Sequence, residues 1–562
     1  MSGTFRKVLC FFLELAILAS AAAFAALAFP NPLSDTGWGF LVFFSLIPLF
    51  RVVDRASWKT VWLHGLAYGF VFYLVYNYWL RTFHPLAILI APILESFQYM
   101  ILLPVLKAAN SFFKKRGYLV QSVFYVAYLY LTQQGFLGYP YGNPSAALWN
   151  YPVLIQSVSI FGIWGISLLL AVPQAFVASR LARRGRPCMR GCMREYRVDG
   201  IVYLSVFVVN LAFGLVSLRY YDDAPVERTV RIATVQHSAD SWEGGYATYE
   251  RNFETLSSLS LEAMKENPDM VVWSETAFVP SVAWHKAYPS NWMTSRLCDR
   301  FVDFGMSLPV PLVTGNPEGL LKDETLPAFL EDGSRNWKTY NTVILFGGGD
   351  ILGTYRKQHL VPFTEHFPYG KQFPWLYELL LANDYKWWEE GAEATVFSWD
   401  GVKFSTPICF EDTFGYLSAD FVRSGADVLM NLSNDSWSGS VAAQMQHMQL
   451  AVFRAVENRR PLLRSTNSGM TCLVLPSGRV VGMLEPFVEA WRVYSVPIGQ
   501  KDGLTFYTRH PDLLGRLLLA ATPALFVFGA ARAVGRRRRE RIEALYARYG
   551  HLFERLDDRY EC

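Results

Sequence analysis

The stretch KFSTPICFEDTFG, residues 403–415, joins an apolar run of strand character to a cysteine and two carboxylates. Short runs of this kind, bounded by polar residues and glycine, are typical of buried strands in α/β folds. Cys409 closes the run, and Glu411 and Asp412 follow almost at once. Because neighbouring carboxylates disfavour a thiolate, the stretch predicts either an inert buried thiol or a nucleophile that another group activates.

Similar β-branched and apolar runs recur on both sides of this stretch, at residues 229–236, 269–275, 309–316, 341–348, 427–435 and 472–482. Helical patterns separate some of them, at about 246–266, 417–424 and 441–459. The alternation predicts an α/β domain over residues 221–507. Residues 317–338 are polar and turn-rich, which indicates a surface insertion.

The remainder of the chain is too apolar to belong to one soluble domain. Of its 562 residues, 52% are hydrophobic and 16% are aromatic. A helix of about 20 residues crosses a bilayer, and we predict eight such spans, at 8–29, 37–53, 60–80, 86–106, 118–137, 153–179, 199–219 and 511–534. The first resembles a signal peptide, but its length and the spans that follow favour a retained helix.

Positive charge falls in alternate connections between these spans, most densely at 180–197 and 535–541, whereas residues 31–36 and 138–152 carry none. By the positive-inside rule both termini are cytoplasmic and the α/β domain is extracytoplasmic. We therefore predict a polytopic α-helical membrane protein with an inserted α/β domain. Its parts are a bundle of seven spans (1–220), the α/β domain (221–507), a last transmembrane helix (508–535) and a basic amphipathic cytoplasmic tail (536–562).

Composition excludes some classes of partner and site. The net charge of +4 is unremarkable for this length, and we expect no nucleic-acid partner. The seven cysteines are scattered. Cys188 and Cys192 lie four residues apart, but no second pair or His cluster completes a zinc site. We expect no metal and no cofactor.

Three ionisable residues follow predicted strands: Glu275 in DMVVWSE, Lys357 in GTYRKQHLVPF, and Cys409. In α/β folds, strand ends are where side chains meet an open crevice. Together a carboxylate, a lysine and a thiol can transfer an acyl group, because the carboxylate takes the thiol proton and the ammonium stabilises the oxyanion. Core packing for the cysteine and solvated surface positions for the other two remain the alternative.

At these segments the sequence resembles the nitrilase, or carbon–nitrogen hydrolase, superfamily and its Glu-Lys-Cys triad. Longer motifs resemble the bacterial apolipoprotein N-acyltransferase family: KQHLVPFTEHFP (357–368), LSNDSWSG (432–439) and QHMQLAVFRAVENRRPLLRSTNSG (446–469). The resemblance implies an αββα sandwich for the inserted domain. It also implies a multi-pass protein of the bacterial cytoplasmic (inner) membrane, with the catalytic domain on the periplasmic face.

The resemblance also implies the reaction. An acyl chain is expected to move from the sn-1 position of a phospholipid to the α-amino group of a diacylglyceryl-cysteine apolipoprotein, in two stages through a Cys409 thioester. Glu275 is then the general base, and Lys357 supports the oxyanion. The resemblance further implies supporting or substrate-binding roles for six residues: Glu365, the backbone N–H of Phe410, Glu411, Asn341, Trp242 and Trp437. Packing or strand capping is an equal alternative for these six, and we expect a monomer.

Three features depart from the family pattern: the length of the 317–338 insertion, Phe410 where a tyrosine is common, and the tail 536–562, which goes beyond the usual end. The aromatic segment 366–392 predicts a mobile arm that touches lipid, with a core hairpin as the alternative. Two other functions compete with acyl transfer. One is a membrane-tethered amidase with the same triad, and the other is a transporter or receptor with an inactive sensor domain. The sequence leaves acyl-chain and headgroup preference, lipoprotein clients and the role of the tail open.

Overall fold

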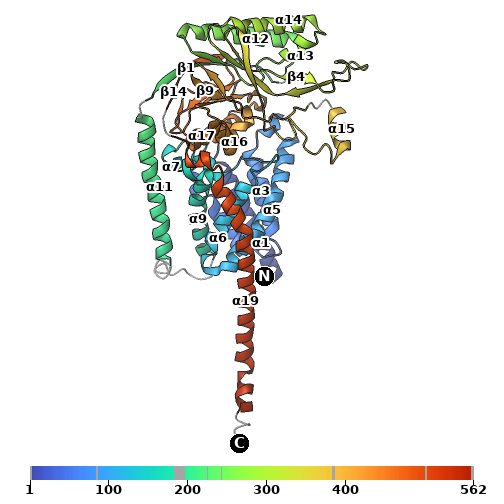
Figure 1. Ribbon diagram of the computed structural model, residues 1–562. Coiled ribbons are helices and arrows are strands. Elements are labelled where there is room, and N and C mark those ends of the chain that lie inside the picture. The colour runs from blue at the N-terminus through green and yellow to red at the C-terminus, as the bar shows by residue number, and fades with distance from the viewer. Residues whose placement is uncertain are drawn as a thin grey trace.

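The computed structural model describes residues 3–83, 86–182, 196–223, 226–241, 243–382, 387–499 and 503–557. A bundle of long helices forms one end of the molecule and an α/β domain forms the other (Figure 1). The bundle contains α1 (Gly3–Ala26), η1 (Gly39–Phe43), α2 (Leu46–Arg55), α3 (Val61–Tyr76), α4 (Leu80–Phe83), α5 (Ala87–Phe113), η2 (Lys114–Arg116), α6 (Gly117–Leu131), η3 (Pro144–Leu148), α7 (Pro152–Ile155), α8 (Val158–Phe161), α9 (Ile163–Leu181), α11 (Arg197–Asp223) and α19 (Leu513–Asp557).

The described part of the chain has five helical stretches long and apolar enough to cross a membrane: Val8–Ala26, Ala87–Leu131, Ile163–Leu181, Arg197–Asp223 and Leu513–Arg548. The second of these comprises α5 and α6, which pack against each other. Of the shorter apolar helices, Val61–Tyr76 lies at another predicted span, and Pro152–Phe161 lies at the same predicted span as Ile163–Leu181. The ten-residue α2 lies at one more. The chain is therefore a membrane protein with several apolar helices, each in a segment where the sequence predicts one.

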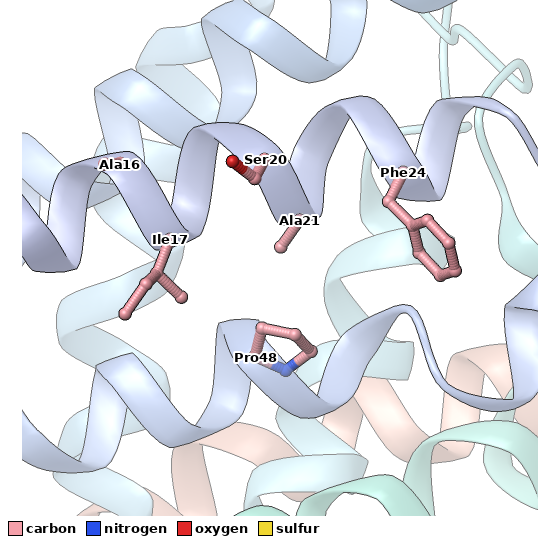
Figure 2. A pocket seen from close by; sticks show the side chains of 6 residues that line it. All are labelled: Ala16, Ile17, Ser20, Ala21, Phe24 and Pro48. Atoms are coloured by element: carbon pink, nitrogen blue, oxygen red, sulfur yellow. The ribbon is translucent and has the colours of Figure 1, made fainter.

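Close helix packing in the bundle depends on small residues. A Cβ atom at Gly65 of α3 would lie 2.2 Å from the Tyr99 carbonyl oxygen of α5, which no side chain tolerates. Small residues let helix backbones approach in membranes, where van der Waals packing drives association. A shallow apolar pocket of about 480 Å³ lies between α1 and α2, where Ile17 and Phe24 face Pro48 (Figure 2). Its lining has no ionisable side chain, so it offers no catalytic group.

The α/β domain contains two six-stranded sheets. The first has the order β14-β1-β2-β3-β6-β7, and the second has the order β13-β12-β11-β10-β9-β8. Their strands are β1 (Arg228–Gln236), β2 (Met270–Val272), β3 (Leu312–Gly315), β6 (Thr342–Gly347), β7 (Asp350–Arg356), β8 (Phe397–Trp399), β9 (Val402–Ser405), β10 (Val428–Ser433), β11 (Leu462–Thr466), β12 (Cys472–Val474), β13 (Val480–Val481) and β14 (Ala490–Ile498). A separate hairpin joins β4 (Glu318–Leu321) to β5 (Trp337–Tyr340).

Successive side chains of the strands face opposite sides of each sheet, so the two sheets pack against each other and each carries helices on its outer face, which makes four layers. Ile232, Val272 and Val313 pack into the core between the two sheets. Their neighbours Ala233, Val271 and Leu312 pack under helices on the other face, because successive side chains of a strand point to opposite faces. The helices of the domain are α12 (Tyr246–Ala263), η4 (Met264–Glu266), α13 (Val282–Ala287), α14 (Trp292–Ser307), α15 (Pro374–Ala382), η5 (Cys409–Thr413), α16 (Gly415–Arg423), η6 (Ser436–Ser438), α17 (Val441–Asn458) and α18 (Phe506–Arg509).

The layer of α16 and α17 lies next to the helical bundle, whereas α12 and α14 lie at the far end (Figure 1). Polar side chains connect the two parts: Gln446 of α17 accepts a hydrogen bond from Trp79 at 2.9 Å and donates to the carbonyl of Pro30 at 2.9 Å. Arg459 donates to Gln156 at 2.7 Å. The second sheet and its helices are thus held directly on the bundle, which places the end of β9 near the membrane helices.

Candidate active site

Cys409 lies where the second sheet ends and η5 begins. Ile408 forms a parallel bridge with Leu432 of β10, and the next residue, Cys409, has a φ of 50°. Side chains rarely adopt this left-handed conformation, and strained turns of this kind concentrate at functional sites. Cys409 is half-buried, whereas Ile408 and Phe410 on either side are buried.

Glu275 and Lys357 reach the same place from the first sheet. Glu275 follows β2, and Lys357 follows β7 directly. Lys357 is fully buried, with its Nζ 2.8 Å from Glu365 Oε1 and 3.5 Å from Glu275 Oε1. Asn341 donates to Glu275 Oε1 at 2.7 Å, and the backbone N–H of Asn434 donates to Oε2 at 2.9 Å. One ammonium group therefore lies between two carboxylates whose oxygens are held in place by amides.

The charges of this group act on the thiol. Burial raises the pKa of Cys409 well above its ordinary value, and the Glu275 carboxylate raises it further, while Lys357 lowers it. Burial also raises the pKa of Glu275, against the effect of Lys357. Burial alone would lower the pKa of Lys357, but Glu365 and Glu275 outweigh it and raise the pKa. At rest the thiol keeps its proton, next to a carboxylate that binds protons more readily than usual.

Glu411 ties the nucleophile turn to the segment after β7. Its carboxylate accepts the backbone N–H of Ile408 at 2.7 Å, that of Gln358 at 2.7 Å and that of His359 at 3.0 Å. The Tyr355 hydroxyl donates to the same carboxylate at 2.8 Å. Burial raises the pKa of Glu411 to about 7, although these donors act in the other direction. Glu411 therefore connects Cys409 to Lys357 through the backbone.

The other sequence-predicted residues have different positions. Phe410 is buried and its ring stacks on Tyr141 at 6.3 Å, from the connection between α6 and α7. Its backbone N–H has no hydrogen-bond partner among the described residues. Trp437 packs edge-on against Trp79 of the bundle at 5.7 Å. Trp242 lies outside the described residues.

Sequence reasoning missed an ionic cluster behind the nucleophile turn. His447 of α17 lies 2.9 Å from both Asp412 and Asp435. Arg464 of β11 pairs with the same two carboxylates, and all four residues are buried. Asp412 and Asp435 belong to the stretches ICFED and LSND, and His447 belongs to QHMQ. Those motifs carry the family resemblance, so the sequence marked these residues as family positions but gave no role for them.

The aromatic segment after Glu365 begins and ends at this site. The Trp388 N–H donates to the Glu365 carbonyl at 2.8 Å, so the chain leaves Glu365 and returns to it. Within the segment, Phe367 is buried against Tyr377 and Trp387. Phe373 and Trp375 are instead 49% and 66% exposed, where α15 stands away from the body of the domain (Figure 1).

Metal chemistry has no evident site in the described residues, where no group of three His, Cys, Asp or Glu side chains is arranged to hold an ion. Cys188 and Cys192 lie outside the described residues. The charged groups described at the site are the Lys357 ammonium and the carboxylates of Glu275 and Glu365, and they lie close to the Cys409 thiol.

Comparisons with known proteins agree with this architecture. Residues 231–498 match the carbon–nitrogen hydrolase family, and residues 21–176 match the apolipoprotein N-acyltransferase N-terminal domain. A curated relative from Treponema denticola, apolipoprotein N-acyltransferase 1, is 38% identical over 91% of this chain and 95% of its own length. Its namesake from Treponema pallidum is 36% identical over 94% of this chain and 97% of its own length. The predicted nitrilase-like domain is thus confirmed.

Proposed function

The chain belongs to the apolipoprotein N-acyltransferase family, and from this premise we propose that it transfers an acyl chain from the sn-1 position of a phospholipid to the N-terminal α-amino group of diacylglyceryl-cysteine apolipoproteins. The observation that carries the proposal is the buried Lys357 held between Glu275 and Glu365, beside a half-buried cysteine on a left-handed turn. Such a group suits covalent acyl transfer.

In the first stage Glu275 accepts the Cys409 thiol proton as Sγ attacks the ester carbonyl of the phospholipid. The tetrahedral oxyanion receives a hydrogen bond from the Phe410 N–H and the charge of Lys357. The C–O bond to the glycerol sn-1 oxygen then breaks, Glu275 returns the proton to that oxygen, and lysophospholipid leaves. The raised pKa of Glu275 supports both steps, because one group must accept and then donate a proton.

In the second stage the α-amino group of the apolipoprotein attacks the thioester carbonyl. Glu275 takes a proton from the attacking nitrogen, the C–S bond breaks, and the thiolate recovers that proton. The amide product leaves and the free thiol is restored. The two substrates therefore react in turn through one covalent intermediate, and neither stage uses a cofactor.

Supporting roles follow from the contacts. Glu365 orients Lys357, and its second oxygen accepts the Val361 N–H at 2.8 Å. Asn341 bridges Glu275 and Glu365, at 2.7 Å and 3.4 Å. Glu411 holds the nucleophile turn. For Trp437 the contact with Trp79 supports a role between the domain and the bundle, and for Trp242 the proposal rests on the sequence motif alone.

The substrates explain the position of the domain. Both are lipid-anchored, so a nucleophile next to the helical bundle meets them without lifting them out of the bilayer. We place the domain on the periplasmic face of the bacterial inner membrane, with eight spans and cytoplasmic termini, because Lys and Arg gather on the opposite side. The parts are residues 1–220, 221–507, 508–535 and 536–562, acting as a monomer.

The aromatic segment 366–392 is the proposed lipid contact of the domain. Its exposed Phe373 and Trp375 suit the interface between headgroups and acyl chains, and its base is hydrogen-bonded to Glu365. Movement of the segment would admit lipid beside Lys357.

A product analysis tests the proposed reaction. The purified protein is incubated with phospholipid labelled in the sn-1 chain and a diacylglyceryl-cysteine peptide, and the products are identified by mass spectrometry. We expect labelled N-acyl peptide and unlabelled lysophospholipid in equal amounts, and neither from Cys409→Ala. Free labelled acid and lysophospholipid without N-acyl peptide would indicate a phospholipase instead. No turnover of either lipid would favour the amidase, if a soluble amide is hydrolysed, or the transporter or receptor, if it is not.

A further inference from the structure

The carbonyl of Cys409 faces two donors. Asn431 of β10 donates to it at 3.0 Å, and Nε2 of His447 lies 3.3 Å from the same oxygen. The C=O of Cys409 and the N–H of Phe410 belong to one trans, planar peptide unit, so they point in opposite directions. Holding the carbonyl on one side therefore fixes the direction of the N–H on the other.

The Phe410 N–H is the donor that this peptide unit offers to the oxyanion. It has no partner among the described residues, while its buried surroundings contain many paired amides. Since Cys409 has a left-handed backbone, the peptide is strained and other orientations compete with the observed one. The observed orientation of this peptide therefore requires contacts that hold it, and the two donors to the Cys409 carbonyl are in position to provide them.

The protonation state of His447 follows from its neighbours. Nδ1 lies 2.9 Å from Asp435 Oδ1 and Nε2 lies 2.9 Å from Asp412 Oδ1. A neutral imidazole would turn a lone pair towards one of these carboxylates, so the contacts require an N–H on both nitrogens. Arg464 also faces the ring and pairs with both carboxylates. Two cations and two carboxylates then make a neutral buried group.

The electrostatics support a protonated ring. Burial lowers the pKa of His447, but Asp435 and Asp412 outweigh burial and the opposing charge of Arg464, which raises the pKa to about 9. The pKa of Asp435 falls to about 2 for the complementary reason, since His447 and Arg464 outweigh its burial. The ring thus stays an imidazolium, and its Nε2–H, shared between Asp412 Oδ1 and the Cys409 carbonyl, is a stronger donor than that of a neutral ring.

We propose that His447 is a positioning residue for acyl transfer: clamped by Asp412 and Asp435, it holds the Cys409 carbonyl together with Asn431 and so aims the Phe410 N–H at the oxyanion. The proposal rests on the acyl-transfer mechanism but not on the identity of the acyl donor. It also gives Asp412, next to the triad cysteine, a function.

Two reactions at Cys409 separate this role from simple support of the fold. Acylation by a p-nitrophenyl ester passes through an oxyanion, whereas alkylation by iodoacetamide does not. In His447→Gln we expect the acylation rate to fall about tenfold or more, since removal of an oxyanion donor costs about 10²–10³-fold, while the alkylation rate stays within about twofold. Asn431→Leu removes the other donor to the carbonyl and should give the same pattern.

The control is His285→Gln, another buried histidine of the domain, on α13, which packs against α14 and β4. It should change neither rate. An unchanged acylation rate in His447→Gln, or equal loss of both reactions in His447→Gln and Asn431→Leu, overturns the proposal. So does a wild type that the ester fails to acylate. Failure of the wild type to release lysophospholipid from phospholipid, with ester acylation intact, counts against the proposed function alone.

Discussion

Both carboxylate oxygens of Glu275 have hydrogen-bonding or charged partners. Asn341 and Lys357 lie at Oε1 and the Asn434 N–H at Oε2. Those contacts orient the carboxylate, and burial raises its pKa. The adjacent thiol has a raised pKa too, and we propose that it transfers its proton to Glu275 during attack rather than forming a standing ion pair. From the sequence alone, the acidic neighbours of Cys409 are expected to disfavour formation of its thiolate. In the structure, Glu411 binds backbone N–H groups and Asp412 pairs with Arg464.

The pH dependence of acylation reports on Glu275. The carboxylate must be unprotonated to accept the thiol proton, so the rate should fall as pH drops through its raised pKa, at a higher pH than for an ordinary glutamate. Glu275→Gln should lower single-turnover thioester formation by about 10²–10⁴-fold, as general base catalysis is lost, and should remove this acid limb. A variant that kept the limb and most of the rate would exclude Glu275 as the base.

A second residue-scale prediction concerns Glu411. Glu411→Gln replaces an acceptor by an NH₂ group, so at least one buried N–H of Ile408, Gln358 or His359 loses its partner. Each such group costs about 1–3 kcal/mol, and the free energy of unfolding should fall by that amount, measured by thermal or denaturant unfolding in detergent. The exposed Glu324→Gln is the control. Equal stability of both variants would contradict the structural role of Glu411.

At the scale of elements, most strands were predictable from apolar runs. β2, β3, β6 and β10 lie within predicted runs, β12 and β13 share one, and β1 and β9 begin one residue before theirs, whereas the interior strand β11 was missed. β7 is an edge strand with alternating exposed and half-buried residues, and in the second half of β14 buried residues alternate with more exposed ones, so a search for continuous apolar runs passes over both. The predicted insertion at 317–338 contains the β4–β5 hairpin, whose ladder was not anticipated.

α17 shows why the ionic cluster escaped sequence reasoning. Its polar residues Gln444, Gln446, His447 and Gln449 suggest a solvated face, yet all its residues from Ala442 to Asn458 are buried. The helix lies between the second sheet and the bundle, so it has no solvated face, and its polar groups pair with both neighbours. Asp412 and Arg464 are 52 residues apart, and only the fold brings such distant charges together. Glu275, Lys357 and Cys409 could be predicted as a group because each lies in a recognisable motif. Their spacing along the sequence would not have been enough.

The aromatic segment 366–392 yields a prediction for an element. The double variant Phe373→Ser with Trp375→Ser should lower phospholipid turnover by about tenfold, because two interfacial anchors are lost. Acylation by the soluble p-nitrophenyl ester should persist. Trp292→Ser is the matched control: Trp292 is 70% exposed on α14, at the end of the molecule far from the bundle (Figure 1). Unchanged phospholipid turnover in the double variant would exclude the segment as the lipid contact.

At the scale of the whole molecule, the bundle and the domain form one unit. Direct hydrogen bonds such as Gln446 to Trp79 and Arg459 to Gln156 fix their relation. The layer that carries Cys409 is therefore held at a set height above the membrane helices. α19 continues well past the bundle on the opposite side (Figure 1), with arginines at 536–539, in keeping with a helix that leaves the membrane on its cytoplasmic side.

Orientation can be tested by labelling. Glu331→Cys lies on the hairpin tip and Arg538→Cys on α19, and both positions are exposed. In intact spheroplasts a membrane-impermeant maleimide should label Glu331→Cys at once, and Arg538→Cys only after permeabilisation. The parent chain, without either substitution, gives the background. The reverse pattern would place the domain in the cytoplasm and contradict the charge-based topology.

In the proposed mechanism Cys409 carries the acyl chain as a thioester. This intermediate can be detected by intact-protein and peptide mass spectrometry after the purified protein is mixed with phospholipid alone, without an acceptor. We expect a mass increase equal to one acyl group, located on the peptide containing Cys409, labile to hydroxylamine and absent from Cys409→Ala. An unmodified Cys409 in wild type that releases lysophospholipid, or the same adduct in Cys409→Ala, would contradict it.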